Sequence, residues 1–175
     1  MDDFFLGLLL VNRPPGTTPL ELLTQEVRED EGILSYRQAD VAVVENQIVG
    51  VTVSFASEQN EATPELEAMI PRDRLAALAD FFNAEVPKSW YVDTLWVDAA
   101  YRRRGIGREL LNRAQARGQA AGRSILSLMS WAAKTGAIVF YKAQGFEQVR
   151  IVPVGQHPAM PHPEGFVLLQ RSIPS

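Results

Sequence analysis

One stretch of the chain joins an apolar segment to an amphipathic segment through a turn with two glycines. Residues 90–97 are rich in β-branched and aromatic side chains without strict polar alternation, which predicts a strand covered on both faces. The turn Arg102-x-x-Gly105-x-Gly107 follows, and apolar residues then recur at helical spacing over 106–121. A strand, a turn and a helix in this order predict a crossover to a parallel strand within a mixed sheet.

The same turn has the features of a phosphate-binding site. Gly105 and Gly107 allow the main chain to approach a ligand without an intervening Cβ, and a helix N-terminus offers unpaired N–H groups. Seven arginines and one acidic residue lie between residues 101 and 123. These features favour a site for a diphosphate ligand. The alternative interpretations are that the glycines only permit a tight turn and that the arginines only form a solvated face.

Several other kinds of site are excluded by composition and motif. The chain lacks the Gly-x-Gly-x-x-Gly dinucleotide fingerprint, and residues 133–136 do not have the order of a Walker loop. It contains no cysteine, which excludes disulfides, thiolate metal sites and cysteine nucleophiles. With only two histidines, we expect no zinc site and no metal in the chemistry. We expect His157 and His162 to be loop residues rather than ligands.

Apolar runs and chain breaks predict the remaining elements. Helices are expected from a Thr17 or Thr18 cap to about Val27, over 64–84 with an interruption near Pro71, and over 135–143. Further strands are expected at 41–44 and 48–55, which form a hairpin, and at 125–129, 146–154 and 165–172. With 175 residues, 46% of them hydrophobic, we expect a single α/β domain over 1–175, a mixed sheet flanked by helices.

Charge is divided unevenly along the chain. Residues 1–100 contain 6 Lys/Arg and 18 Asp/Glu, whereas residues 101–175 contain 11 and 3. The basic half suits an anionic cosubstrate and the acidic half a cationic acceptor, although ordinary solubility explains the acidic half equally well. The net charge of −4 and the lack of interleaved basic and aromatic residues argue against nucleic-acid binding.

The start of the chain bears on location. Residues 1–11 are apolar but short, and they begin with acidic residues, which argues against a signal peptide. No apolar run is long enough to cross a bilayer. We therefore expect a cytoplasmic protein with no membrane partner.

A second motif, Ala137-x-x-Phe140-Tyr141-Lys142-Ala143-Gln144-Gly145-Phe146, lies downstream of the glycine turn. Together with residues 91–97 and the Arg102 turn, it resembles the GNAT superfamily of acyl-CoA-dependent N-acyltransferases over about residues 33–154. The resemblance implies a GNAT-like mixed sheet and acetyl-CoA as cosubstrate. It also implies transfer of an acetyl group to a primary amine by direct attack.

The resemblance implies a role for individual residues. Backbone N–H groups from Arg103 to Arg108 would bind the pyrophosphate of coenzyme A, and the strand containing Leu95 and Val97 would pair with pantetheine. The cofactor-binding residues are thus expected to be Leu95, Val97, Arg102, Arg103, Arg104, Gly105, Ile106, Gly107 and Arg108. Tyr141 would protonate the departing thiolate as a general acid. Its alternative role is that of a core aromatic residue.

An amine must lose a proton before it can attack a thioester. Asp93 is the one carboxylate within the apolar strand, and burial would raise its pKa towards that of a useful base. The alternative is that Asp93 anchors a neighbouring strand or loop through hydrogen bonds. We expect a small cationic amine as acceptor, and the rival function is a non-catalytic acyl-CoA sensor or structural module.

Two departures from the family pattern have consequences. Lys134 occupies a position where many members have asparagine, so one polar contact is replaced by a cation near the phosphates. The first family strand is either missing or replaced by residues 6–11. A missing edge strand would expose the backbone of the hairpin, and this makes a homodimer possible.

Overall fold

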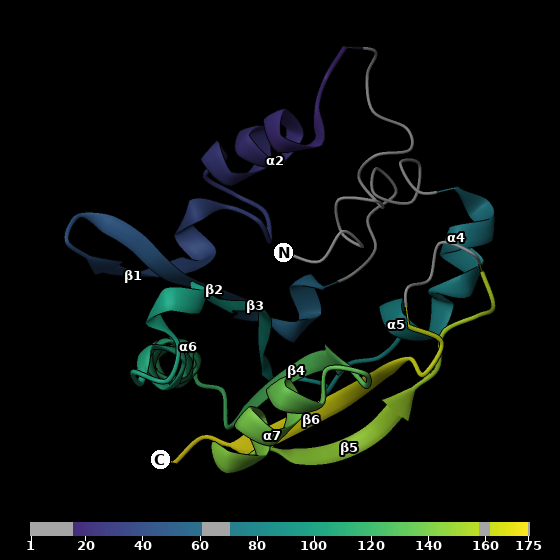
Figure 1. The fold of residues 1–175 in the computed structure, drawn as a ribbon. Coiled ribbons are helices and arrows are strands. Elements are labelled where there is room, and N and C mark those ends of the chain that lie inside the picture. The colour runs from purple at the N-terminus through teal and green to yellow at the C-terminus, as the bar shows by residue number, and fades with distance from the viewer. Residues whose placement is uncertain (1–15, 61–70, 158–161, 175) are drawn as a thin grey trace.

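The computed structural model describes residues 16–60, 71–157 and 162–174. In these residues the sheet has six strands in the order β1-β2-β3-β4-β6-β5 (Figure 1). The strands are β1 (Ala39–Val44), β2 (Gln47–Ala56), β3 (Trp90–Val97), β4 (Ile125–Trp131), β5 (Glu147–Val152) and β6 (Phe166–Ser172). β3 and β4 run parallel, and the other neighbours run antiparallel. The fold is therefore the α/β class with the mixed sheet that the sequence predicts.

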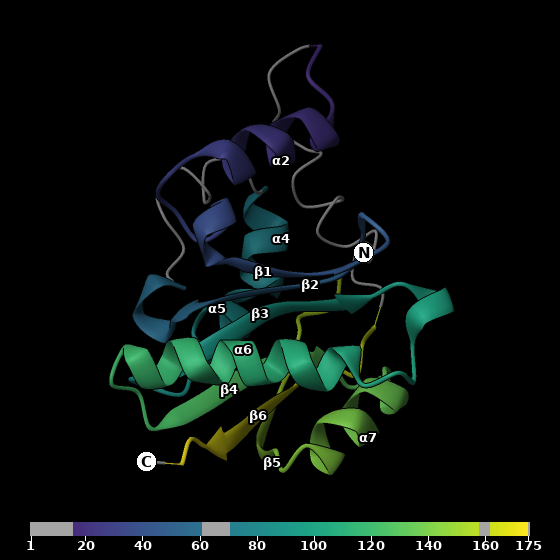
Figure 2. The same ribbon diagram turned by 90° about the vertical axis from the view of Figure 1, so that its left-hand side faces the viewer.

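Helices cover both faces of the sheet. They are α2 (Pro19–Arg28), α4 (Arg72–Ala77), α5 (Ala79–Phe82), α6 (Ile106–Ala120) and α7 (Thr135–Ala143). Figure 2 shows α2 and α4 on one side of the sheet and α6 and α7 on the other. α2 begins at Thr18, which forms a capping box with Glu21, so the predicted cap is confirmed.

Successive side chains of a strand point to opposite faces of the sheet, and the buried side chains therefore form two cores. Leu126 and Leu128 of β4 pack with residues of α6 and α7. Trp131 of the same strand is buried with Leu78, between α4 and α5, and with residues of β6. The central strands are thus covered on both faces, which explains their nearly continuous apolar sequences.

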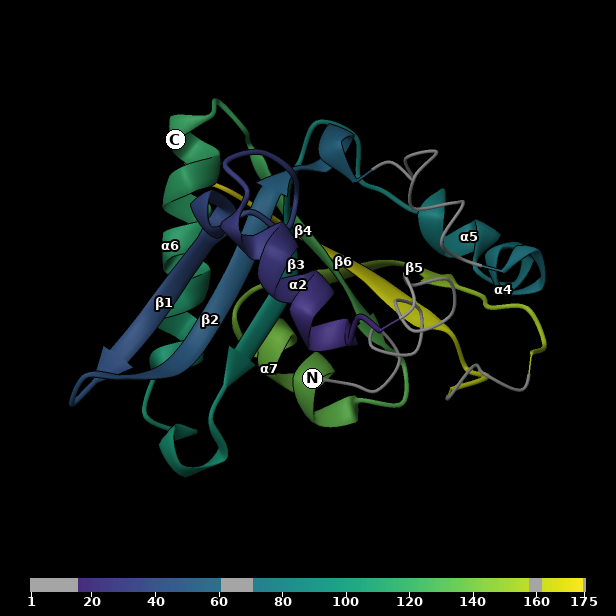
Figure 3. The ribbon, with the colours of Figure 1, turned by 90° about the horizontal axis from the view of Figure 1, so that it is seen from above.

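The parallel pair of strands separates partway along its length. Trp90 to Val92 pair with Leu126 to Leu128. Beyond these residues, β3 continues to Val97 and β4 to Trp131, but the two strands no longer pair with each other. Figure 3 shows the two strands diverging beyond this point. On its other edge, β3 has a register shift, because Ser54 faces Val92 and Val53 faces Thr94. Asp93 is the extra residue and forms a β-bulge where the strands separate.

Most predicted elements are confirmed, with small changes at their ends. The strand at 90–97 and the helix at 135–143 have the predicted bounds. The strand predicted at 146–154 ends at Val152, because Pro153 has no N–H to continue the ladder. Residues 1–11 and 64–70 lie outside the described residues. Within the described ranges, no helix combines the length and the apolarity that crossing a membrane requires.

Candidate active site

The turn between β3 and α6 ends at a helix N-terminus without a side-chain cap. Arg103 and Gly105 both have left-handed backbone angles, with φ of 64° and 85°. Gly105 is the N-cap residue of α6, and within the described part of the chain no side chain caps this end of the helix. The N–H groups of the first helical turn, from Ile106 to Arg108, therefore have no intrahelical acceptor and can receive an anion.

The arginines of this turn have different surroundings. Arg102 Nε donates a hydrogen bond to the carbonyl oxygen of Val97 at 3.0 Å, so its side chain folds back onto the end of β3. Arg104 stacks on a neighbouring tyrosine ring, with 5.1 Å between the guanidinium carbon and the ring centroid. Arg108 Nη2 lies 4.0 Å from the place that a Cβ on Gly105 would occupy. Arg108 thus brings a positive charge beside the uncapped helix end.

Gly107 lies where α6 approaches α7 and the end of β3 most closely. A Cβ at Gly107 would lie 3.2 Å from Phe140 Cζ and 3.8 Å from Val97 Cγ2. Leu95, also on β3, packs against the core shared by α6 and α7. The glycine turn, the end of β3 and the second sequence motif therefore meet at one place.

The main chain of β3 beyond the bulge has a strand partner on one edge. Leu95 pairs with Thr52, and Val97 pairs with Gly50, both on β2. In the described residues, β4 no longer pairs with this part of β3 on the opposite edge. Backbone groups there are available to an extended ligand that enters beside the strand.

Asp93 lies where β3 separates from β4. Thr94 Oγ1 donates a hydrogen bond to Asp93 Oδ2 at 2.9 Å. Burial nevertheless raises the pKa of the Asp93 carboxyl above its usual value, because desolvation outweighs this hydrogen bond. A carboxylate in such surroundings is a stronger base than an exposed one.

Tyr141 is buried on the face of α7 that packs against the sheet. Its ring contacts Phe140 and Phe146 edge-on, with centroids 5.4 and 5.7 Å away. Burial raises the pKa of Tyr141 to about 12. Among the described residues, no hydrogen bond to its hydroxyl is formed. The phenol therefore stays protonated at neutral pH and is available as a donor.

Tyr91 connects these two groups electrostatically and was not predicted from the sequence. Burial raises the pKa of Tyr91, and the charges of Asp93 and Tyr141 raise it further. The charges of the predicted base and of the predicted acid therefore both act on the Tyr91 phenol. In the sequence, Tyr91 resembles any other aromatic residue of a buried strand.

The histidines lie in the loop between β5 and β6. His157 Nε2 lies 3.0 Å from Asp73 Oδ2 on α4. The ring of His162 meets Trp131 edge-on at 5.1 Å between centroids. Across residues 16–60, 71–157 and 162–174, no three His, Cys, Asp or Glu side chains are grouped as metal ligands.

Comparisons with known proteins relate these features to a family. The model of the acetyltransferase (GNAT) domain matches residues 37–148. An uncharacterized N-acetyltransferase of Methanocaldococcus jannaschii is 39% identical over 70 residues, which are 40% of this chain and 31% of that protein. The chain thus spans about a third of the length of this relative.

Solved structures show the same fold. A crystal structure of an acetyltransferase has a TM-score of 0.65 and 22% identity, covering 89% of this chain and 80% of that one. An N-acetyltransferase from Staphylococcus aureus Mu50 has a TM-score of 0.62 and 19% identity, covering 95% and 89%. At these identities the similarity shows a shared architecture.

Proposed function

Because the chain belongs to the GNAT acetyltransferase family, we propose that it transfers an acetyl group from acetyl-CoA to a primary amine. One observation supports this function above all. The uncapped N-terminus of α6 lies at the end of β3, the strand that separates from β4 just before it. An anion-binding helix end and a strand edge without a partner suit the two parts of coenzyme A.

The proposed cosubstrate site uses main-chain groups for most of its contacts. Backbone N–H groups between Arg103 and Arg108 bind the pyrophosphate, and the guanidinium of Arg108 adds charge. The free edge of β3 at Leu95 and Val97 pairs with the amide groups of pantetheine. The fit is supported by Gly105, since a residue with a Cβ would be strained at its φ of 85°.

The proposed chemistry is aminolysis of a thioester. Asp93 accepts a proton from the ammonium form of the acceptor, and the neutral nitrogen then forms a bond with the acetyl carbonyl carbon. The carbon–sulfur bond breaks, and Tyr141 donates its phenolic proton to the thiolate that leaves. The nitrogen, which is positively charged after the attack, then loses its second proton, and this proton restores the Tyr141 phenol. The products are an N-acetyl amide and the free thiol of coenzyme A. The raised pKa of Asp93 favours the first transfer, and that of Tyr141 keeps the donor protonated.

A small cationic amine is the proposed acceptor. This part of the proposal rests on the 18 acidic residues and 6 basic residues among the first 100. An excess of negative charge attracts cationic ligands and raises their local concentration. Polyamines and aminoglycosides are suitable probes of this class.

The test is a panel of amines with acetyl-CoA, read by release of the coenzyme A thiol. We expect polyamines or aminoglycosides to react faster than neutral and anionic amines. Faster turnover of neutral or anionic amines would contradict the proposed acceptor class.

The Tyr141→Phe variant tests whether the chain is an enzyme or a sensor. We expect its rate to fall while its affinity for coenzyme A, measured by calorimetry, stays unchanged. Binding of acetyl-CoA without acetylation of any amine in the panel would instead favour an acyl-CoA sensor.

A further inference from the structure

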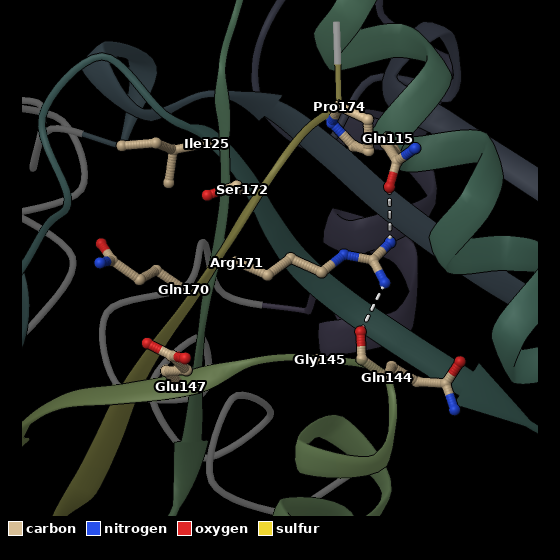
Figure 4. Close-up of a pocket in the computed structure, with 9 residues that line it drawn as sticks. All are labelled: Gln115, Ile125, Gln144, Gly145, Glu147, Gln170, Arg171, Ser172 and Pro174. Atoms are coloured by element: carbon tan, nitrogen blue, oxygen red, sulfur yellow. Dashed lines mark hydrogen bonds between the residues drawn. The ribbon is translucent and has the colours of Figure 1, made fainter.

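Arg171 of β6 reaches across to the two helices on its face of the sheet (Figure 4). Its Nη1 atom donates a hydrogen bond to the carbonyl oxygen of Gln144 at 2.8 Å, at the end of α7. Its Nη2 atom donates to Gln115 Oε1 on α6 at 3.0 Å. The guanidinium carbon also lies 5.0 Å from the centroid of the Phe146 ring. Arg171 thus joins β6 to the C-terminal end of α7 and to α6.

The turn that Arg171 contacts also holds Tyr141. The N–H of Phe146 donates to the carbonyl oxygen of Tyr141 at 3.1 Å, and that of Gly145 donates to Lys142 at 3.0 Å. Gly145 has a φ of 83°, so the end of α7 is a Schellman motif. The rings of Tyr141 and Phe146 form the apolar contact of this motif. Arg171 therefore contacts two residues, Gln144 and Phe146, that fix the position of Tyr141.

The surroundings of Arg171 point to a positional role. Its side chain is partly buried, which lowers the pKa of the guanidinium, and its buried Nε has no hydrogen-bond partner. Among the described residues, no carboxylate lies within ion-pair distance of it. A charge held in this way is offset mainly by its hydrogen bonds, including the one to a carbonyl at a helix C-terminus.

Arg171 also lines an open cleft of about 440 Å³. Figure 4 shows that Gln170 and Ser172 point to the opposite side of β6 from Arg171. Glu147 adds a negative charge to the same cleft. The polar groups therefore do not converge on one ligand, and the contacts of Arg171 with α6 and α7 are its principal interactions.

We propose that Arg171 is a positioning residue that fixes the C-terminal end of α7 and so aims the hydroxyl of Tyr141 at the leaving thiolate. This inference rests on the proposed role of Tyr141 as the general acid. Arg171 itself touches no reacting atom, so its effect on the rate is transmitted through Tyr141.

A double-mutant cycle tests the proposal, using Arg171→Met, Tyr141→Phe and the combined variant. We expect Tyr141→Phe to lower kcat about 100-fold, as loss of a general acid does. Arg171→Met should lower kcat about 10-fold alone and less than about twofold when Tyr141 is already phenylalanine. The KM for acetyl-CoA should change little, because the β3–α6 turn is untouched.

Arg123→Met is the matched control. Arg123 is also partly buried, its Nε also lacks a partner, and it pairs with Glu58 at 2.7 Å. It lies in the turn between the C-terminal end of α6 and the start of β4. We expect a similar loss of thermal stability from both arginine variants, but an unchanged kcat for Arg123→Met. If Arg171→Met does not fold, Arg171→Lys replaces it in the cycle, since lysine retains the charge and one hydrogen bond.

A second readout does not depend on turnover. The ultraviolet titration of the phenol, taken as the difference from Tyr141→Phe, should show a lower pKa for Tyr141 in the Arg171 variant because a loosened helix end admits water. Equal losses of kcat in both tyrosine backgrounds would overturn the inference and leave the proposed function standing. An unchanged rate in Tyr141→Phe would remove the proposed acid and the inference together.

Discussion

Gly107 of α6 and Phe140 of α7 approach so closely that a methyl group on Gly107 would lie 3.2 Å from Phe140 Cζ. This contact links the proposed phosphate-binding turn to the helix that carries Tyr141. A side chain at Gly107 would therefore press on Phe140 and disturb the packing of the two helices.

The Gly107→Ala variant tests this contact. We expect a loss of about 1 kcal/mol in the free energy of unfolding, because Phe140 must shift, together with weaker binding of coenzyme A. Chemical denaturation and calorimetry measure the two effects. Gly136→Ala is the control, since no atom lies within 4 Å of its added Cβ, and Phe140→Leu should restore stability to Gly107→Ala. Unchanged stability and affinity in Gly107→Ala would contradict the account.

The alkaline side of the pH–rate profile reports on Tyr141. Burial raises the pKa of its phenol to about 12, so the proton-donating form persists above the ordinary tyrosine value of about 10. We expect kcat to remain level through pH 10 in steady-state assays, provided that the protein stays folded. A decline in kcat centred near pH 10, absent in Tyr141→Phe, would show that the phenol is not shielded from water.

The Asp93 carboxyl is expected to reduce stability at neutral pH. Its pKa is raised by burial, so the folded state holds the proton more tightly than the unfolded chain does. Stability is therefore lost as the pH rises from the unfolded value of about 3.9 through the higher folded value. Asp93→Asn should have a higher melting temperature at pH 7, and this advantage should vanish below pH 4.

The same variant should acetylate amines about 100-fold more slowly, because the base is absent. Asp80→Asn, at an exposed carboxyl on α5, should change neither the rate nor the melting temperature. A melting temperature of Asp93→Asn at or below that of the parent at pH 7 would show that the carboxylate is stabilised by contacts rather than strained by burial.

Strand β1 forms one edge of the described sheet, and its side chains Val41 and Val43 are 51% and 55% exposed. An apolar edge strand pairs readily with another chain. We expect a homodimer in sedimentation measurements, and we expect Val41→Lys with Val43→Lys to dissociate it. Val139→Lys on α7, at a side chain that is 66% exposed, is the control for added charge. A parent protein that is monomeric at every concentration would exclude this dimer.

Local patterns predicted most of the fold. The apolar run at 90–97 and the glycines that follow α6 and α7, Gly122 and Gly145, define elements whose bounds depend on a few neighbouring residues. By contrast, β4 continues two residues beyond its predicted end at Met129, since Trp131 is buried against Phe166 of β6. That contact joins residues distant in the sequence and leaves no periodic pattern.

The geometry of the site was less predictable. The bulge at Asp93 depends on how β3 aligns with β2. Its position, where β3 separates from β4, depends on how far those two strands pair. The closeness of Gly107 and Phe140 depends on the packing of two helices. Tyr91 lies in the predicted strand without a signal that sets it apart, and Arg171 belongs to no motif, because their roles arise only when strands and helices are assembled.

We propose above all that main-chain N–H groups between Arg103 and Arg108 bind the diphosphate of coenzyme A, and a crystal structure of the protein with acetyl-CoA is the decisive test. We expect diphosphate oxygens within hydrogen-bonding distance of these N–H groups, at the N-terminus of α6. Density for the diphosphate at another place, or none at saturating acetyl-CoA, would contradict it.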